Sequence, residues 1–201
     1  MKRELDYFTV DGKPGGNQRW FWDPVLRIGG CAALCACDSC IALARANGLT
    51  KLYPYDAACV TRREYKRFAK QMKRYLHPGF QGVPKLELFT AGLGNYLADR
   101  GEKRLRMTEF SGLEPVETAA EVIRAEIDAG FPIPCMMLRH ENPAMKDYIW
   151  HWFLLTGWAD EEDGFCVQAT TYSASEWLSL DTLWNTGCEE RGGLILYRLA
   201  E

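Results

Sequence analysis

The sequence predicts a single α+β domain, residues 1–201, in which N-terminal helices pack on a C-terminal antiparallel sheet. Its 201 residues, 47% of them hydrophobic and 25% charged, are enough for one sizeable core. Apolar residues recur at helical intervals in the first two thirds of the chain, whereas the last third alternates with a period near two. Helices followed by strands, without a βαβα alternation, indicate the α+β class.

The clearest helix is predicted over residues 31–46, where the side chains are small or aliphatic on every side and Asn47-Gly48 supplies a stop. A helix that is apolar all round is a buried helix. A second helix is expected to begin at Thr61, whose spacing to Glu64 is that of a capping box, and to end at His77-Pro78.

Two more helices are predicted over residues 86–100 and 116–127, closed by Gly101 and Gly130, with a short strand over 103–108 between them. Later segments rich in aromatic and aliphatic residues, separated by turn-forming residues, are predicted as strands. They cover residues 133–139, 149–157, 165–172 and 193–199.

Charge and composition exclude several classes of partner. The chain has 24 Lys or Arg and 27 Asp or Glu, so its formal charge of −3 argues against a nucleic-acid binder. A polar N-terminus and the lack of about 18 consecutive apolar residues predict a cytoplasmic protein with no membrane partner. In that compartment the eight cysteines are expected to be reduced thiols.

The sharpest local feature is Gly29-Gly30-Cys31 at the start of the buried helix. The first turn of a helix carries free N–H groups and the positive end of the helix dipole, which stabilise a thiolate. We therefore expect a lowered thiol pKa and a nucleophilic Cys31, although a small buried side chain at a tight turn is the plainer interpretation.

Of the three histidines, His151 is the candidate for proton transfer. It lies on a predicted strand, where alternation places it with Phe153 and Leu155 among large aromatic residues. An imidazole in such surroundings must hydrogen-bond or take part in chemistry, because leaving it unpaired costs roughly 1–3 kcal/mol. A core histidine with satisfied hydrogen bonds is the alternative.

A cysteine that opens a buried helix, followed more than a hundred residues later by a histidine at the start of a strand, resembles the order in papain-like cysteine peptidases. Residues 151–158 match their pattern His-x-x-x-x-x-Gly-aromatic. The chain also resembles a family of uncharacterised bacterial proteins through its motifs at residues 17–21, 29–31, 52–56, 150–153 and 183–187. The resemblance implies a papain-like fold and acyl transfer to Cys31, with His151 as general base.

The resemblance also implies two supporting residues. Gln18 corresponds to the glutamine of the oxyanion hole, although it lies thirteen residues upstream of Cys31 instead of the usual half-dozen. Thr170 or Thr171 stands where the family has an Asn or Asp that orients the histidine. A threonine hydroxyl cannot balance an imidazolium charge, so weaker activity is expected. Asp181 is an alternative partner, although capping of a short helix explains it better.

The aromatic residues suggest an apolar cleft wall beside Cys31 and His151, and hence a peptide or small amide substrate with an apolar or small acyl group. The candidate substrate-binding residues are Trp20, Gly30, Trp150, Trp152 and Tyr172, with Trp22 and Trp158 nearby in the sequence. No cofactor and no metal are expected, and the sequence leaves the oligomeric state open.

Two other interpretations compete with the hydrolase. The first is a catalytically silent papain-like domain that binds a peptide or partner protein, which the lack of an Asn or Asp near Thr170 favours. The second is a redox or metal protein, which would need Cys35, Cys37 or Cys40 to converge with Cys166 or Cys188. Cys37 and Cys40 have a metal-like spacing, but the predicted helix turns them to different sides.

Overall fold

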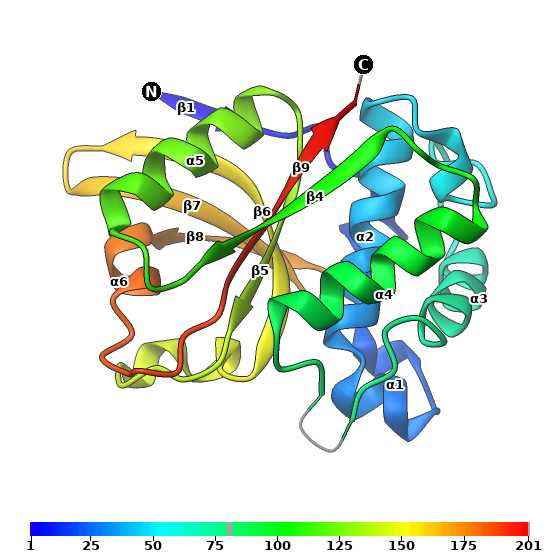
Figure 1. Cartoon of the computed structure of the whole chain (residues 1–201), viewed down its shortest axis with the longest axis horizontal. Coiled ribbons are helices and arrows are strands. Elements are labelled where there is room, and N and C mark those ends of the chain that lie inside the picture. Colours follow the sequence, from blue (N-terminus) through cyan, green and yellow to red (C-terminus); the bar gives the residue numbers. More distant parts are fainter. Residues whose placement is uncertain (80–81, 201) are drawn as a thin grey trace.

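The computed structural model in Figure 1 describes residues 1–79 and 82–200 and shows a large antiparallel sheet with helices on both faces. Six strands lie in the order β4-β9-β5-β6-β7-β8, and β1 pairs with the far half of β6. Their bounds are β4 (Leu105–Ser111), β9 (Gly193–Leu199), β5 (Ile133–Met137), β6 (His151–Glu161), β7 (Gly164–Thr171), β8 (Ala174–Ser179) and β1 (Lys2–Glu4). The separate hairpin consists of β2 (Thr9–Val10) and β3 (Lys13–Pro14).

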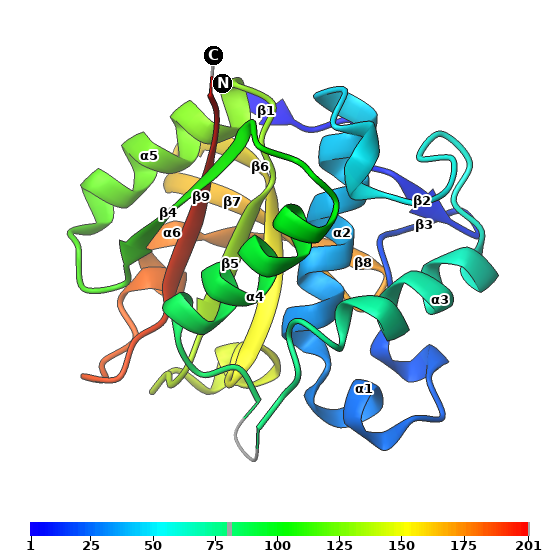
Figure 2. The same ribbon diagram turned by 45° about the vertical axis from the view of Figure 1, so that its right-hand side comes forward.

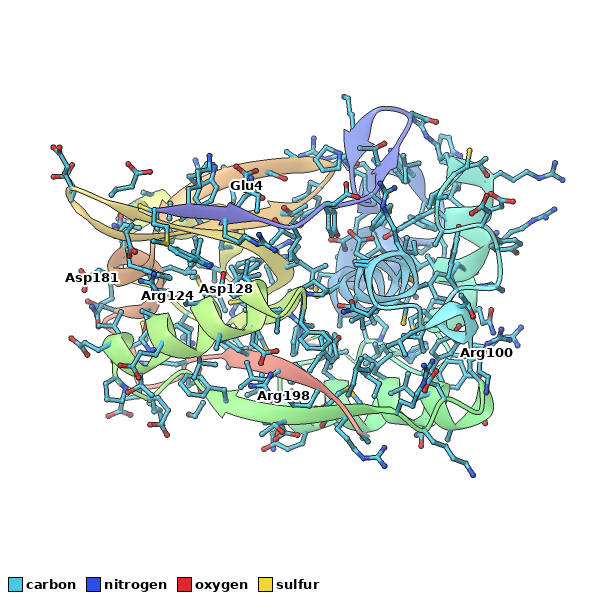
Figure 3. The ribbon with its side chains drawn as sticks, turned by 90° about the horizontal axis from the view of Figure 1, so that it is seen from above. Glu4, Arg100, Arg124, Asp128, Asp181 and Arg198 are labelled. Carbon is cyan, nitrogen blue, oxygen red and sulfur yellow. The ribbon has the colours of Figure 1, made fainter. Side chains whose placement is uncertain are left out.

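Helix α2 (Cys31–Ala46) is the central helix of the fold, and fourteen of its sixteen residues are buried. It packs against β6 on one side and α3 on another, and it is seen almost end-on in Figure 3. The other helices are α1 (Pro24–Gly29), α3 (Arg62–Met72), α4 (Leu86–Asp99), α5 (Val116–Asp128) and α6 (Leu180–Trp184). Among the described residues, none of these helices is both long and apolar enough to cross a membrane.

Strand β6 divides the interior into two cores. Trp152 and Leu154 belong to the core that α2, α3 and α4 cover, whereas Phe153 and Leu155 belong to the core beneath α5 and α6. Successive side chains of a strand point to opposite faces, so both faces of β6 are apolar. Figure 2 shows α2 and α4 on one side of the sheet and α5 on the other. The start of β6 is therefore held from several directions.

The structure confirms the α+β class and most of the predicted elements. The buried helix has its predicted bounds, and the Thr61–Glu64 capping box starts α3, which ends earlier than expected, at Met72. The short strand expected over 103–108 lies instead at Leu105–Ser111. Helix α1, strand β8 and the N-terminal strands were not predicted, because their segments are short or largely polar.

Gly30 is required by a close approach of two helices. Its φ is −80°, which any residue can adopt, but a Cβ atom at this position would lie 2.5 Å from the carbonyl oxygen of Leu26. Helix α1 ends at Gly29 and α2 begins at Cys31, so one residue must turn the chain against the last turn of α1. The glycine therefore sets where the N-terminus of α2 can lie.

We predict that Gly30→Ala destabilises the fold by roughly 1–3 kcal/mol, because the added methyl group overpacks the α1–α2 junction. Gly94→Ala is the matched control, since a Cβ there meets only the Met107 side chain, at 3.8 Å. Within helix α4 this control should stabilise by roughly 0.5–1 kcal/mol. Urea unfolding of both variants measures the effects. Equal stabilities would contradict the close-approach explanation.

Candidate active site

Cys31 is the first residue of α2, and its side chain is buried, with 8% of the residue exposed. It lies on the boundary between two hollows. One is a small internal cavity of about 20 Å³, and the other is an open groove of about 640 Å³. The internal cavity has room for roughly one water molecule. Cys31 thus lies between a small polar hollow and a wide surface groove.

The internal cavity brings together the residues that the sequence predicts for catalysis. Cys31, His151 and Gln18 all line it, and Thr170, Thr171 and Tyr172 complete the wall on the β7 side. These residues come from α2, the start of β6, the short 3-10 helix Gln18–Trp20 and the end of β7. Segments more than a hundred residues apart therefore border one cavity at the N-terminus of α2.

His151 is fixed by one hydrogen bond and two aromatic rings. Its Nε2 atom lies 2.7 Å from the hydroxyl oxygen of Thr171. The Tyr172 ring stacks on the imidazole with centroids 4.8 Å apart and planes 4° apart, and Phe153 lies on the ring at 6.2 Å. Among the described residues, Nδ1 makes no hydrogen bond. A hydrogen bond thus holds Nε2 in place, whereas Nδ1 is left to accept or donate a proton.

The backbone on both sides of this pair is strained. Trp150, directly before His151, has φ +53°, and Tyr172, directly after Thr171, has φ +51°. Positive φ is costly for a residue with a bulky side chain, by about 1–3 kcal/mol, and it persists only where the surroundings impose it. Such strain clusters at functional sites.

The threonine that meets His151 is Thr171, and the choice of Thr170 is corrected. The Thr170 hydroxyl lies 2.8 Å from those of Thr156 and Ser175, in a row of hydroxyl groups that joins β6, β7 and β8. Neighbouring residues of a strand point to opposite faces, so only one of the two threonines can face the imidazole. Thr170 lines the cavity wall, but its hydroxyl group connects neighbouring strands of the sheet.

Both candidate catalytic groups are neutral at rest. Burial raises the pKa of the Cys31 thiol, although the backbone N–H groups of Trp152, Ala32 and Cys31 itself act in the opposite direction. Burial lowers the pKa of His151 to about 4. The expectation of a lowered thiol pKa is therefore wrong, because desolvation at this helix end outweighs the N–H groups and the dipole.

Gln18 lies beside Cys31 although thirteen residues separate them in sequence. Helix α1 folds the intervening chain back, so that Nε2 of Gln18 donates a 3.2 Å hydrogen bond to the Leu26 carbonyl. The side chain is 4% exposed and lines the internal cavity. One N–H of the amide is used to hold the side chain, and the amide carries a second.

The open groove is apolar, and none of its described lining residues carries a charge. Pro24, Val25 and Ile28 of α1 form one wall, and Pro78 and Trp150 contribute to the rest. Ile28 is 82% exposed and Trp150 is 41% exposed, so the groove presents large apolar surface to solvent. The contribution of α1 was missed, although Asp23-Pro24 is a helix start that the sequence contains.

The predicted aromatic wall is only partly correct. Trp150 faces the groove and Tyr172 the internal cavity. Trp152 also lines the internal cavity, but its indole is in the core, where it stacks on Phe89 at 4.4 Å and donates to the Val83 carbonyl. Trp20 packs edge-on against Tyr65 and lines neither hollow. Gly30 lines neither hollow either, and its role is to allow the close approach at the α1–α2 junction.

The remaining aromatic and polar candidates lie outside the two hollows at Cys31. Trp158 donates its indole N–H to Asp128 of α5, which Figure 3 shows well away from α2. Trp22 is 91% exposed and lines neither of the two hollows at Cys31. Asp181 lies in the first turn of α6 and accepts from Asn185, while Ser179 caps that helix.

The other cysteines do not converge on a second site. All eight lie in the described part of the chain and are free thiols, and Cys37 and Cys40 are buried in the core. The Cys35 thiol donates to the Phe153 carbonyl at 3.4 Å. No group of three or more His, Cys, Asp or Glu among the described residues is placed to hold a metal ion.

We predict that His151 makes folding stability depend on pH. The unfolded chain protonates this residue near pH 6.5, but the folded protein does so only near pH 4. The unfolded state therefore binds more protons between these values, and the folded protein loses stability as the pH falls from 6.5 to 4, by up to roughly 3 kcal/mol.

The measurement is the free energy of unfolding of the wild type and of His151→Gln at pH 4.5 and pH 7.5. The glutamine variant should lack this part of the pH dependence, so the difference between the two proteins should shrink at the lower pH. A difference that does not change with pH would mean that the imidazole titrates normally.

Three comparisons with known proteins bear on the identity of this site. No protein-family model, no curated protein and no solved structure matches this chain. What the site can do follows from the residues of this chain and from where the fold places them.

Proposed function

We propose that this protein is a papain-like cysteine hydrolase, which transfers the acyl group of a peptide or small amide to Cys31 and then releases it to water. One observation carries the proposal. Cys31, His151, Gln18 and Thr171 line a single cavity, and Cys31 also opens onto an apolar groove large enough for a substrate. Nucleophile, base and oxyanion donors in one place are what acyl transfer needs.

In the first step Sγ of Cys31 attacks the carbonyl carbon, and the thiol proton passes to Nδ1 of His151. Burial keeps both groups neutral before the substrate reacts. The proton therefore moves while the bond between Sγ and the carbonyl carbon forms, and no thiolate is present beforehand. The developing oxyanion accepts hydrogen bonds from the Cys31 N–H and from the Gln18 amide. The imidazolium then protonates the leaving amine, which leaves a thioester on Cys31.

The second step reverses these roles. A water molecule enters where the amine has left, His151 removes its proton, and attack on the thioester carbonyl releases the acid and restores the thiol. The Thr171 hydroxyl holds Nε2 and so keeps Nδ1 directed to the reacting atoms. It carries no charge to balance the imidazolium, and the reaction is accordingly slower than with a carboxylate.

The groove defines the acyl side of the substrate. Pro24, Val25, Ile28, Pro78 and Trp150 are among its lining residues, and their apolar atoms favour a bulky uncharged acyl group. A carboxylate or ammonium group would lose water there without gaining a partner among the described lining residues.

The second candidate function is a silent papain-like domain that binds a peptide in the same groove. Two observations favour it: the Cys31 thiol is 8% exposed with a raised pKa, and a threonine hydroxyl stands where a carboxylate or amide would orient the imidazole. Such a domain would bind apolar peptides and leave them intact. Covalent capture of an acyl group separates the two functions.

We predict that the wild type forms a thioester on Cys31 with a coumarin amide of N-blocked phenylalanine, and that Cys31→Ala forms none. Release of coumarin should fall by at least about 10³-fold in that variant. Cys59→Ala is the matched control, because Cys59 is exposed and lines neither hollow at Cys31, so this variant should keep most of the activity. Intact-protein mass spectrometry after acid quenching shows the thioester. A wild type that binds the amide without acylation would support the silent domain.

We predict that Ile28→Asp raises the KM for this amide by roughly 5–30-fold with little change in kcat, because it places a charge in the apolar groove. Leu113→Asp is the matched control, since Leu113 is 68% exposed and lines neither hollow at Cys31. Steady-state kinetics of the three proteins measure the effect. An unchanged KM in Ile28→Asp would place the acyl group elsewhere.

A further inference from the structure

Asp38 is the only acidic residue in α2, and it is buried. It lies two turns beyond Cys31 and lines the same internal cavity. Its Oδ2 atom accepts hydrogen bonds from the Gly16 N–H at 3.2 Å and from the Tyr7 hydroxyl at 3.0 Å, and its Oδ1 accepts one from the Tyr65 hydroxyl at 2.5 Å. Among the described residues no lysine or arginine pairs with it.

Burying a carboxylate without a cation costs free energy, and here three hydrogen-bond donors offset that cost. Such a set of donors around one carboxylate indicates a role beyond packing. Gly16 is the donor that leads to the active site. Its carbonyl accepts the N–H of Ser173 at 3.0 Å, and the next residue, Asn17, donates its side-chain amide to the Tyr172 carbonyl at 2.6 Å. Tyr172 in turn stacks on His151. A continuous path of contacts thus joins Asp38 to the imidazole.

The turn at the end of this path needs support from outside. Tyr172 and Ser173 both have positive φ, +51° and +61°, in the two-residue connection between β7 and β8. That conformation favours Asn and Gly, so Tyr-Ser is strained there. The bonds from Ser173 to Gly16 and from Asn17 to Tyr172 hold the strained turn against the N-terminal segment.

We propose that Asp38 is a positioning residue for the Cys31–His151 site: its carboxylate holds Gly16 against α2, and through Gly16 it holds the Tyr172 turn over the imidazole. The inference rests on the proposed function and adds how the site is kept in order. Gly16 suits this place because an added Cβ would overlap the Tyr65 hydroxyl group. Gln18, two residues further along the same segment, lines the same cavity.

The arrangement also makes the site sensitive to acid. Burial raises the pKa of Asp38 to about 6, although its three donors act in the opposite direction. The other titratable groups that face it are Tyr7, Tyr65, Cys35 and Cys37, whose pKa values burial raises well above their usual range. Below pH 6, Asp38 is the group of this cluster that changes charge. Once protonated, it offers one acceptor fewer to its three donors.

The test compares Asp38→Asn with Tyr7→Phe, which removes one donor from the same carboxylate but leaves the Gly16 bond intact. In the wild type the Tyr172 ring should shift the proton resonances of His151 upfield, and kcat for the coumarin amide should fall in two steps, near pH 6 and near pH 4. Asp38→Asn should lose the upfield shift and the step near pH 6, with kcat lower by roughly tenfold and KM nearly unchanged. Tyr7→Phe should keep the upfield shift, and its Asp38 step should remain but move to higher pH, because one donor that lowers the Asp38 pKa is lost.

A second variant covers the case in which Asp38→Asn does not fold. Asn17→Ala breaks the last link, at the half-buried Asn17 side chain, and should also remove the upfield shift of His151. If folded Asp38→Asn keeps the His151 resonances and the pH profile of the wild type, the positioning role is wrong. Failure of the proposed function is distinguishable, because the His151 resonances report on position even in a protein that does not acylate Cys31.

Discussion

The contact between the first turn of α2 and the first residues of β6 is the constraint on which the rest of the site depends. It joins Cys31 and Cys35 to a strand more than a hundred residues away, through the hydrogen bond from Cys35 to the Phe153 carbonyl. Gly30 permits this contact by removing a side chain at the α1–α2 junction. The surrounding cores keep it rigid, since both faces of β6 are covered. The position of the thiol relative to the imidazole therefore follows from the packing of the whole fold.

The same burial sets the chemistry. An exposed helix N-terminus favours a thiolate, but here the loss of solvation is the larger effect on both Cys31 and His151. In the proposed hydrolase, the proton would therefore stay on sulfur until an electrophile arrives. The contacts that hold the site are neutral: a hydroxyl group on Nε2, two aromatic rings stacked with the imidazole, and an amide tied to the Leu26 carbonyl.

The extent to which sequence predicted this structure follows from the strength of each local signal. Residues 31–46 were predicted in full because apolar side chains surround the helix, and Thr61 and Glu64 located the start of α3. Strand β8 carries no apolar alternation and was missed. Cys31, His151 and Gln18 could be identified as candidates, but their meeting depends on how α1 folds back, which no local pattern records.

Finer features of the site depend on which face of a strand each residue occupies and on how far each side chain is removed from solvent. Thr170 and Thr171 differ only in which face of β7 they occupy, and Trp150 and Trp152 differ by whether they precede or enter β6. One residue of register decides between the two threonines, whereas the start of β6 separates the two tryptophans. The direction of the Cys31 pKa shift could not be deduced either, because it depends on how much chain covers the thiol.

The strained turn at Tyr172 and Ser173 has a consequence for how this protein would respond to selection. Asn-Gly at these two positions would suit the backbone better, so a screen for heat resistance alone would favour that replacement. It would also remove the aromatic ring from the imidazole. Under the proposed function, robustness and reactivity are therefore opposed at this one hairpin, and a lineage selected for robustness alone would retain the architecture while losing the proposed chemistry.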